Sequence, residues 1–163
     1  DGIRDVAVTG VQTCALPILI EQLEPVDQMF FVCHSLGGIY ALHLADYYKD
    51  RVLGAVTLST PYGGAELADY AKYFYFFSQL LKDIGPKSKP MRQADKIKIV
   101  WPWANVVTTK GSAPWILEDN DGVVTLASQR AHPDMELIEV DYNHYEVVLG
   151  PSIVEIIRTR IPK

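Results

Sequence analysis

The sequence predicts an α/β domain in which helices flank a mostly parallel sheet. Two short apolar runs, 29–33 and 52–58, lack polar alternation, which is typical of strands buried on both faces. An alanine- and leucine-rich stretch of helical length, 39–48, lies between them. A strand, a helix and a parallel strand in this order form the repeating unit of α/β folds.

The remaining elements continue this alternation. Gly37-Gly38 opens the helix after the first strand, and Pro25 ends a helix before it. Residues 135–140 alternate in polarity and predict a strand with one face or edge in water, and Pro151 suits the first turn of a final helix. The expected helices are 19–24, 39–48, 65–84 and 152–160, and the expected strands are 29–33, 52–58, 97–101 and 135–140.

Length and composition indicate one globular domain and exclude several functional classes. The chain has 163 residues, of which 48% are hydrophobic and 21% charged, and its net charge of −5 argues against a nucleic-acid partner. The longest apolar runs are shorter than the ~18 residues that a membrane span needs. The two cysteines cannot form a disulfide-dense scaffold, and no cysteine and histidine pattern has zinc spacing. We therefore expect neither a metal nor a cofactor.

Residues 1–18 resemble the translation of a sequencing-library adapter. Sixteen of these positions match adapter codons in order, and Val6-Ala7 correspond to a six-base index. We therefore expect residues 1–18 to be a non-native segment without native core, and residues 19–163 to be the domain. Cys33 would then be the sole natural cysteine. The alternative is a genuine N-terminal strand around residues 6–9.

The residues with the clearest chemical meaning are Cys33-His34-Ser35-Leu36-Gly37-Gly38, between the first strand and its helix. A serine on a sharp strand-to-helix turn projects its hydroxyl above the edge of the sheet. Its neighbours must be small because strand and helix nearly touch there. Without chemistry, the same residues would be only a serine- and glycine-rich helix start.

This pattern resembles the nucleophile elbow of the α/β-hydrolase family, especially of its lipases and esterases. The resemblance implies that Ser35 is the nucleophile and that the Leu36 backbone N–H is one oxyanion donor. Cys33 stands where the family usually has glycine, which predicts some strain in the elbow. The family's chain order then implies an acid and a histidine downstream. Asp121 before Gly122 is the expected acid, and Asp119 is the alternative. Both could instead belong to a solvated acidic turn.

Four histidines compete for the role of general base. His144 follows the last expected strand, where the family places this residue, so we expect it to be the base. His34 flanks the nucleophile and is expected to point away from it. His43 lies within a helix, and His132 lies in a polar loop before a proline.

The resemblance covers residues 25–163 and implies the C-terminal half of the α/β-hydrolase fold. The strand at 29–33 would then lack its usual neighbour and leave an apolar edge open to self-association. The loop that gives the family its second oxyanion donor would also be absent. Residues 59–64 resemble the family's loop beside the acyl pocket, and the aromatic segment 70–77 is either a small lid or a core helix. We expect Trp101, Trp103 and Trp115 to be packing residues.

The leading functional hypothesis is a serine hydrolase of small apolar carboxylic esters that acts through an acyl-enzyme. The truncation predicts weak activity. The alternatives are a catalytically inactive fragment that self-associates, and a thioesterase, acyltransferase or peptidase with the same triad.

Overall fold

The structure, a computed structural model, describes residues 15–64, 89–114 and 116–162. Its strands are β1 (Met29–His34), β2 (Val52–Leu58), β3 (Trp103–Thr108) and β4 (Glu136–Val140). Its helices are α1 (Ala15–Leu23), α2 (Leu36–Tyr48), α5 (Lys89–Ala94), α6 (Leu126–Gln129) and α7 (Pro151–Arg158). Two 3-10 turns, η1 (Lys49–Arg51) and η3 (Glu146–Leu149), complete the described elements.

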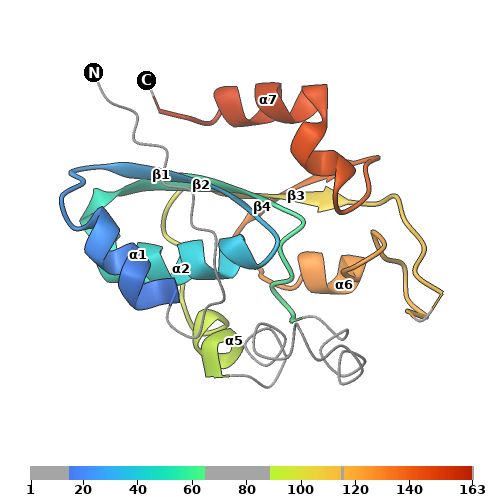
Figure 1. Ribbon diagram of the computed structural model, residues 1–163, viewed down its shortest axis with the longest axis horizontal. Helices are drawn as coiled ribbons and strands as arrows, with labels where there is room; N and C mark the ends of the chain where they lie inside the picture. Colours follow the sequence, from blue (N-terminus) through green and yellow to red (C-terminus); the bar gives the residue numbers. More distant parts are fainter. Residues whose placement is uncertain (1–14, 65–88, 115, 163) are drawn as a thin grey trace.

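The four strands form one parallel sheet in the order β1-β2-β3-β4, and helices lie on both of its faces (Figure 1). This arrangement confirms the predicted fold class. Because the strands are parallel, their carboxyl ends meet at one edge of the sheet. The residues that follow β1, β2, β3 and β4 therefore come together there.

Two hydrophobic cores hold the helices to the sheet. One core joins α2, α1 and α5 to the face that carries Met29 and Phe31. The other lies on the opposite face, where Val147 and Ile153 pack against inward-facing residues of β2 and β3. Helix α2, which connects β1 to β2, is buried around most of its circumference.

The third strand was predicted at 97–101, and this was wrong: β3 runs from Trp103 to Thr108. Pro102 separates the two segments, and its carbonyl accepts a hydrogen bond from the Ala55 backbone N–H at the start of the pairing with β2. All six β3 residues are buried. The polar residues Asn105 and Thr108 hid this strand from a search for apolar runs.

Helix α1 begins at Ala15, inside the segment that resembles an adapter, rather than at Leu19. Leu16 packs against the core beneath α2, together with Leu19 and Ile20. The last residues of the adapter-like segment therefore form part of a helix in this structure. Residues 1–14 lie outside the described residues, as do the aromatic segment 70–77 and Trp115.

The two edges of the sheet differ in chemistry. On β4, Glu136 forms an ion pair with Arg160, and Glu139 forms one with Arg130. Strand β1 carries the residues MFFVCH without an acidic or basic pair, and its Val32 is 47% exposed. Among the described strands β1 has a neighbour on one side only, as the sequence predicts. In the described ranges, no helix has the length and apolar character to cross a membrane.

Candidate active site

The turn between β1 and α2 places Ser35 at the carboxyl edge of the sheet in a strained backbone conformation. Its φ and ψ are 54° and −129°, a region that costs a residue with a side chain roughly 1–3 kcal/mol. Three hydrogen bonds hold this turn. The Ser35 N–H donates to the Leu58 carbonyl at 2.8 Å, and the Ser35 carbonyl accepts from the Gly38 N–H and the Thr60 hydroxyl. The neighbouring strand thus fixes the conformation of the serine.

The two glycines after Leu36 differ in how strictly they are required. A Cβ on Gly38 would lie 2.2 Å from Thr60 Oγ1, so only glycine lets α2 approach the residue that holds the serine. A Cβ on Gly37 would meet only Cys33 Cβ, at an ordinary 3.5 Å.

Burial raises the pKa of the Cys33 thiol to about 11, so this cysteine remains protonated at neutral pH.

Ser35, His144 and Asp121 form a continuous hydrogen-bonded chain. His144 Nε2 lies 3.1 Å from Ser35 Oγ, and His144 Nδ1 lies 2.9 Å from Asp121 Oδ2. Each residue comes from a different loop at the carboxyl edge. His144 is 3% exposed and Asp121 is 1% exposed, whereas Ser35 is only partly buried. The hydroxyl is therefore the accessible end of the chain, and the acid is its enclosed end.

Asp121 is surrounded by donors. Its Oδ1 accepts from the backbone N–H groups of Val123 and Val124, and its Oδ2 accepts from the Thr108 hydroxyl and the Gln129 side-chain amide as well as from His144. Burial by itself raises the pKa of this carboxyl, but the hydrogen bonds from His144, Thr108 and Val124 outweigh it and lower the pKa below its ordinary value. The carboxyl is therefore ionised at neutral pH and acts only as an acceptor.

The local sequence explains how the acid reaches this position. The Asn120 side chain accepts from the Gly122 N–H, and Gly122 has a φ of 95°, which turns the chain sharply after Asp121. The His144 N–H donates to the Asp121 carbonyl, so the two loops are also joined through their backbones. Asp119, the alternative acid, is exposed and contributes only its carbonyl, which accepts from the Leu126 N–H.

The other histidines have different surroundings. His34 does not point away from the site as expected: its Nε2 lies 2.8 Å from the His144 carbonyl, and the two rings are 4.8 Å apart. Burial lowers the pKa of His34, so its neutral form is favoured and its Nε2–H can donate to that carbonyl. His132 is buried against Tyr62 and bonded to the Ile97 carbonyl, and His43 lines a distant cavity.

Sequence reasoning missed a group of buried polar residues behind the acid. Thr108 ends β3, and its hydroxyl lies 2.9 Å from Ser59 Oγ. The Gln129 side chain is fully buried and also accepts from the Thr108 N–H. Threonine and glutamine form no catalytic motif, and the strand that Thr108 ends was predicted at other residues. The one available signal was the position of Gln129 near the acid loop.

The first residues of the segment 59–64 belong to this buried framework. Ser59 and Thr60 are 0% exposed, and the Tyr62 hydroxyl bonds to Thr57 and accepts from the indole N–H of Trp103. Burial raises the pKa of Tyr62, which keeps the phenol protonated. Trp103 packs in the core, as the sequence predicts.

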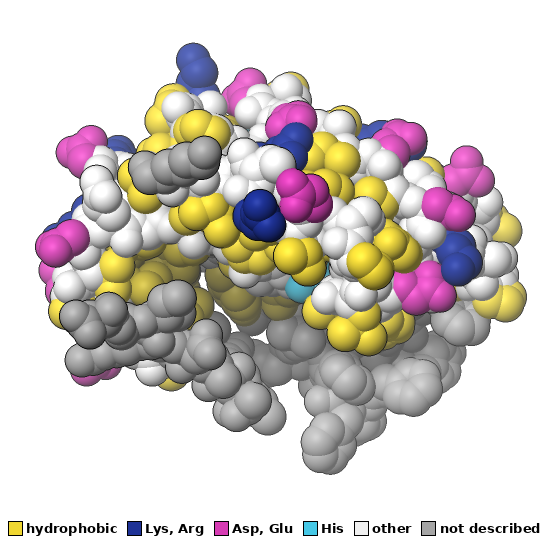
Figure 2. All heavy atoms as spheres, turned by 90° about the horizontal axis from the view of Figure 1, so that it is seen from above, with side chains coloured by type: hydrophobic (Ala, Val, Ile, Leu, Met, Phe, Trp, Pro, Cys, Tyr) yellow, Lys and Arg dark blue, Asp and Glu magenta, His cyan; other side chains and the backbone are white. Residues whose placement is uncertain are grey.

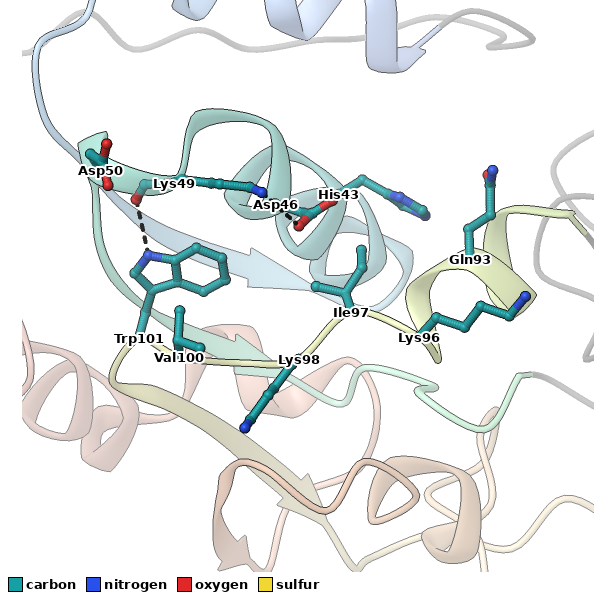
Figure 3. Close-up of a pocket in the computed structure, with 10 residues that line it drawn as sticks. All are labelled: His43, Asp46, Lys49, Asp50, Gln93, Lys96, Ile97, Lys98, Val100 and Trp101. Atoms are coloured by element: carbon teal, nitrogen blue, oxygen red, sulfur yellow. Dashed lines mark hydrogen bonds and ion pairs between the residues drawn. The ribbon is translucent and has the colours of Figure 1, made fainter.

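A cavity of about 660 Å³ lies away from the serine, between the second half of α2 and residues 93–101 (Figure 3). Its wall mixes acidic and basic side chains, including the exposed pair Asp46 and Lys49, and none of the three bonded residues lines it. Trp101 borders this cavity while its indole N–H donates to the Lys49 carbonyl. The cavity is therefore unconnected with the chemistry of Ser35.

In the described part of the chain, no cluster of three or more His, Cys, Asp or Glu could hold a metal ion.

Comparison with known proteins gave matches at the level of structure alone. No family model matches the chain, and no curated protein matches its sequence. The mature lipase of Bacillus licheniformis superposes with a TM-score of 0.63 at 17% identity, over 88% of this chain and 69% of the lipase. The monoacylglycerol lipase of Paleococcus ferrophilus gives 0.54 at 18% identity, over 89% of this chain and 71% of that one.

A third match is a carboxyl esterase from a metagenome, with a TM-score of 0.62 at 17% identity. It covers 81% of this chain and half, 50%, of the esterase. The parallel sheet, its flanking helices and these matches together show that the described chain has the α/β-hydrolase fold of lipases and esterases.

Proposed function

We propose that this protein is a serine hydrolase of carboxylic esters in which Ser35, His144 and Asp121 act as a catalytic triad. The observation that carries the proposal is the unbroken chain from Ser35 Oγ through both ring nitrogens of His144 to Asp121 Oδ2. This nucleophile, base and acid geometry is the one that acyl transfer by serine requires. The fold that the chain shares with lipases and esterases supports it.

The environment of Asp121 supports a specific protonation state for the histidine. Because the carboxylate is ionised and can only accept, the proton between it and His144 resides on Nδ1. His144 Nε2 is then free to accept the Ser35 proton. The serine hydroxyl attacks the ester carbonyl as its proton passes to Nε2, and the protonated imidazole returns that proton to the departing alcohol. Water then releases the acid from the acyl-serine by the same steps.

The elbow supplies electrostatic help for the developing oxyanion. Leu36 is the first residue of α2, and the first backbone N–H groups of a helix have no intrahelical partner. We assign the Leu36 N–H as one oxyanion donor. One such donor is worth ~10²–10³ in turnover.

Exposed apolar side chains near His144 support a small apolar ester as the substrate. The Tyr145 ring lies 5.4 Å from the His144 ring and is 71% exposed, and the following η3 turn exposes Val148 and Leu149. Apolar surface beside a nucleophile favours an apolar acyl or alcohol group. Hydrolysis of thioesters, hydrolysis of amides and acyl transfer to an acceptor other than water are the alternative reactions for the same triad.

Hydrolysis of p-nitrophenyl butyrate tests this proposal. We expect saturable release of nitrophenol that Ser35→Ala abolishes and Ser112→Ala, at an exposed serine, leaves unchanged. Activity retained in Ser35→Ala would refute the assigned nucleophile. A folded protein without ester turnover but with thioester turnover would move the proposal to the thioesterase alternative.

A further inference from the structure

The buried hydroxyls of Ser59 and Thr108 form a donor chain that ends on the acid. The Thr108 hydroxyl has a single proton, and its short contact to Asp121 Oδ2 means that it donates there. The Ser59 hydroxyl, 2.9 Å away, must then donate to Thr108. Both residues are 0% exposed, so no bulk water competes for these bonds. The orientation of each proton in this chain follows from the ionised carboxylate at its end.

The adjacent residues Ser59 and Thr60 support both ends of the hydrogen-bonded series Ser35, His144 and Asp121. Ser59 acts on Asp121 through Thr108, while the adjacent Thr60 donates to the carbonyl of Ser35. Ser59 itself has a φ of 52°, and its N–H is fixed by the Val106 carbonyl. A strained residue at the end of β2 is thus held by its neighbours where it can support the acid.

We propose that Thr108, oriented by Ser59, is a positioning residue that fixes Asp121 and limits how strongly its carboxylate can stabilise a charged His144. The physical basis is competition at one oxygen. Asp121 Oδ2 accepts from Thr108, Gln129 and His144 together, and each added donor takes up part of its negative charge. Removing the Thr108 hydroxyl leaves more of that charge for the imidazolium. The role of Thr108 in catalysis rests on the proposed function. Its effect on the protonation of His144 does not.

The expected consequence is a rise in the pKa of His144. The other groups that face this ring are His34, Tyr145 and Ser35, and they are the same in every variant compared here. In Thr108→Val, which keeps the shape of the side chain and loses the donor, we expect an increase of about half a pKa unit, a ~3-fold change in protonation. Thr108→Ser keeps the hydroxyl and should match the wild type.

Titration of the His144 imidazole by nitrogen-15 NMR reads this shift without any turnover. A raised pKa in Thr108→Val and an unchanged one in Thr108→Ser is the expected result. Equal values in all three proteins would overturn the inference, as would an equal shift in Thr108→Ser. If the expected shift occurs in a protein that does not hydrolyse esters, the inference holds and the proposed hydrolase function fails.

The substitution leaves Ser59 without its acceptor, so Thr108→Val could fold poorly. The double variant Ser59→Ala/Thr108→Val removes both hydroxyls at once and should fold, because replacing both partners of a buried hydrogen bond is far less costly than replacing one. It should show the same rise in the His144 pKa. Where hydrolysis is measurable, the acid limb of kcat/KM should move to higher pH by the same amount with KM unchanged, which a purely structural defect would not produce.

Discussion

At the scale of single residues, hydrogen-bond partners distinguish the carboxylate of Asp121 from that of Asp119. Asp121 accepts hydrogen bonds through both oxygens, whereas Asp119, two residues earlier, is exposed and uses only its backbone. Both belong to the same acidic turn, and the sequence favoured Asp121 with Asp119 as the alternative. The structure separates them because the turn at Gly122 directs one carboxylate inward.

This difference predicts opposite outcomes for two matched substitutions. Asp121→Asn places an amide where His144 Nδ1 needs an acceptor, and it should lower kcat for p-nitrophenyl butyrate by about 10³–10⁴-fold through the wrong histidine tautomer. Asp119→Asn should stay within about twofold of wild type. Steady-state kinetics of both proteins, with circular dichroism to verify folding, check this. A large loss in Asp119→Asn with little change in Asp121→Asn would reverse the assignment.

Much of the candidate site, but not its supporting residues, could be predicted from the sequence. The contact between Ser35 and His144 was predictable, because their positions relative to strands follow a motif and a chain order. His34, Thr108 and Gln129 were not, because their roles depend on contacts between loops far apart in the chain. A residue before a nucleophile, or at the end of a strand, gives no pattern that reports which carbonyl or carboxylate it will meet.

At the scale of elements, the approach of α2 to the end of β2 depends on one glycine. Gly38→Ala would force its Cβ into Thr60, the residue that holds the Ser35 carbonyl, and should cost about 1–3 kcal/mol of unfolding free energy by overpacking. The displaced Thr60 should also lower the catalytic rate.

Gly37→Ala is the matched control, since its Cβ meets only ordinary contact and alanine favours a helix by about 0.5–1 kcal/mol. Urea denaturation of the two variants should therefore give changes of opposite sign. Equal stability of both would show that Thr60 moves aside without cost.

The edge of β1 that has no neighbour among the described strands predicts self-association. Strand β1 lacks the ion pairs that β4 carries, and Val32 is exposed on it. Seen from above, the surface of the molecule shows hydrophobic side chains between charged ones (Figure 2). We expect concentration-dependent oligomers in sedimentation velocity, and we expect Val32→Lys to shift them toward monomer. Leu137→Lys, at a partly exposed position of β4, should leave them unchanged. A wild-type protein that is monomeric at all concentrations would contradict this.

The elements also show where pattern reasoning succeeds. Strand β2 lies at its predicted residues and β1 extends the prediction by one, because uninterrupted apolar runs are typical of parallel strands. The prediction of β3 was misplaced because this strand contains the polar residues Asn105 and Thr108. Both are buried and form hydrogen bonds with the residues behind Asp121. Polar residues that a strand contributes to a buried hydrogen-bond network thus interrupt the apolar pattern by which the strand would be predicted.

At the scale of the whole molecule, the first described helix crosses the predicted domain boundary at Leu19. Residues 15–18 belong to α1, and Leu16 contacts the core. We expect deletion of residues 1–14 to leave the free energy of unfolding unchanged, as the adapter resemblance predicts. Deletion of residues 1–18 should lower it by roughly 1 kcal/mol, because the first turn of α1 and the burial of Leu16 are lost. Thermal denaturation of both shortened proteins measures this. A loss of several kcal/mol on removing residues 1–14 would assign that segment a structural role.

The central claim is that the chain activates Ser35, and reaction with a fluorophosphonate tests it most directly. This probe captures an activated serine even when turnover is slow. Intact mass and peptide mapping should show one adduct per chain, on Ser35, and the labelling rate should fall at least ~100-fold in His144→Ala, which lacks the base. Absence of labelling in the folded wild-type protein, or labelling that His144→Ala leaves unchanged, would contradict the account.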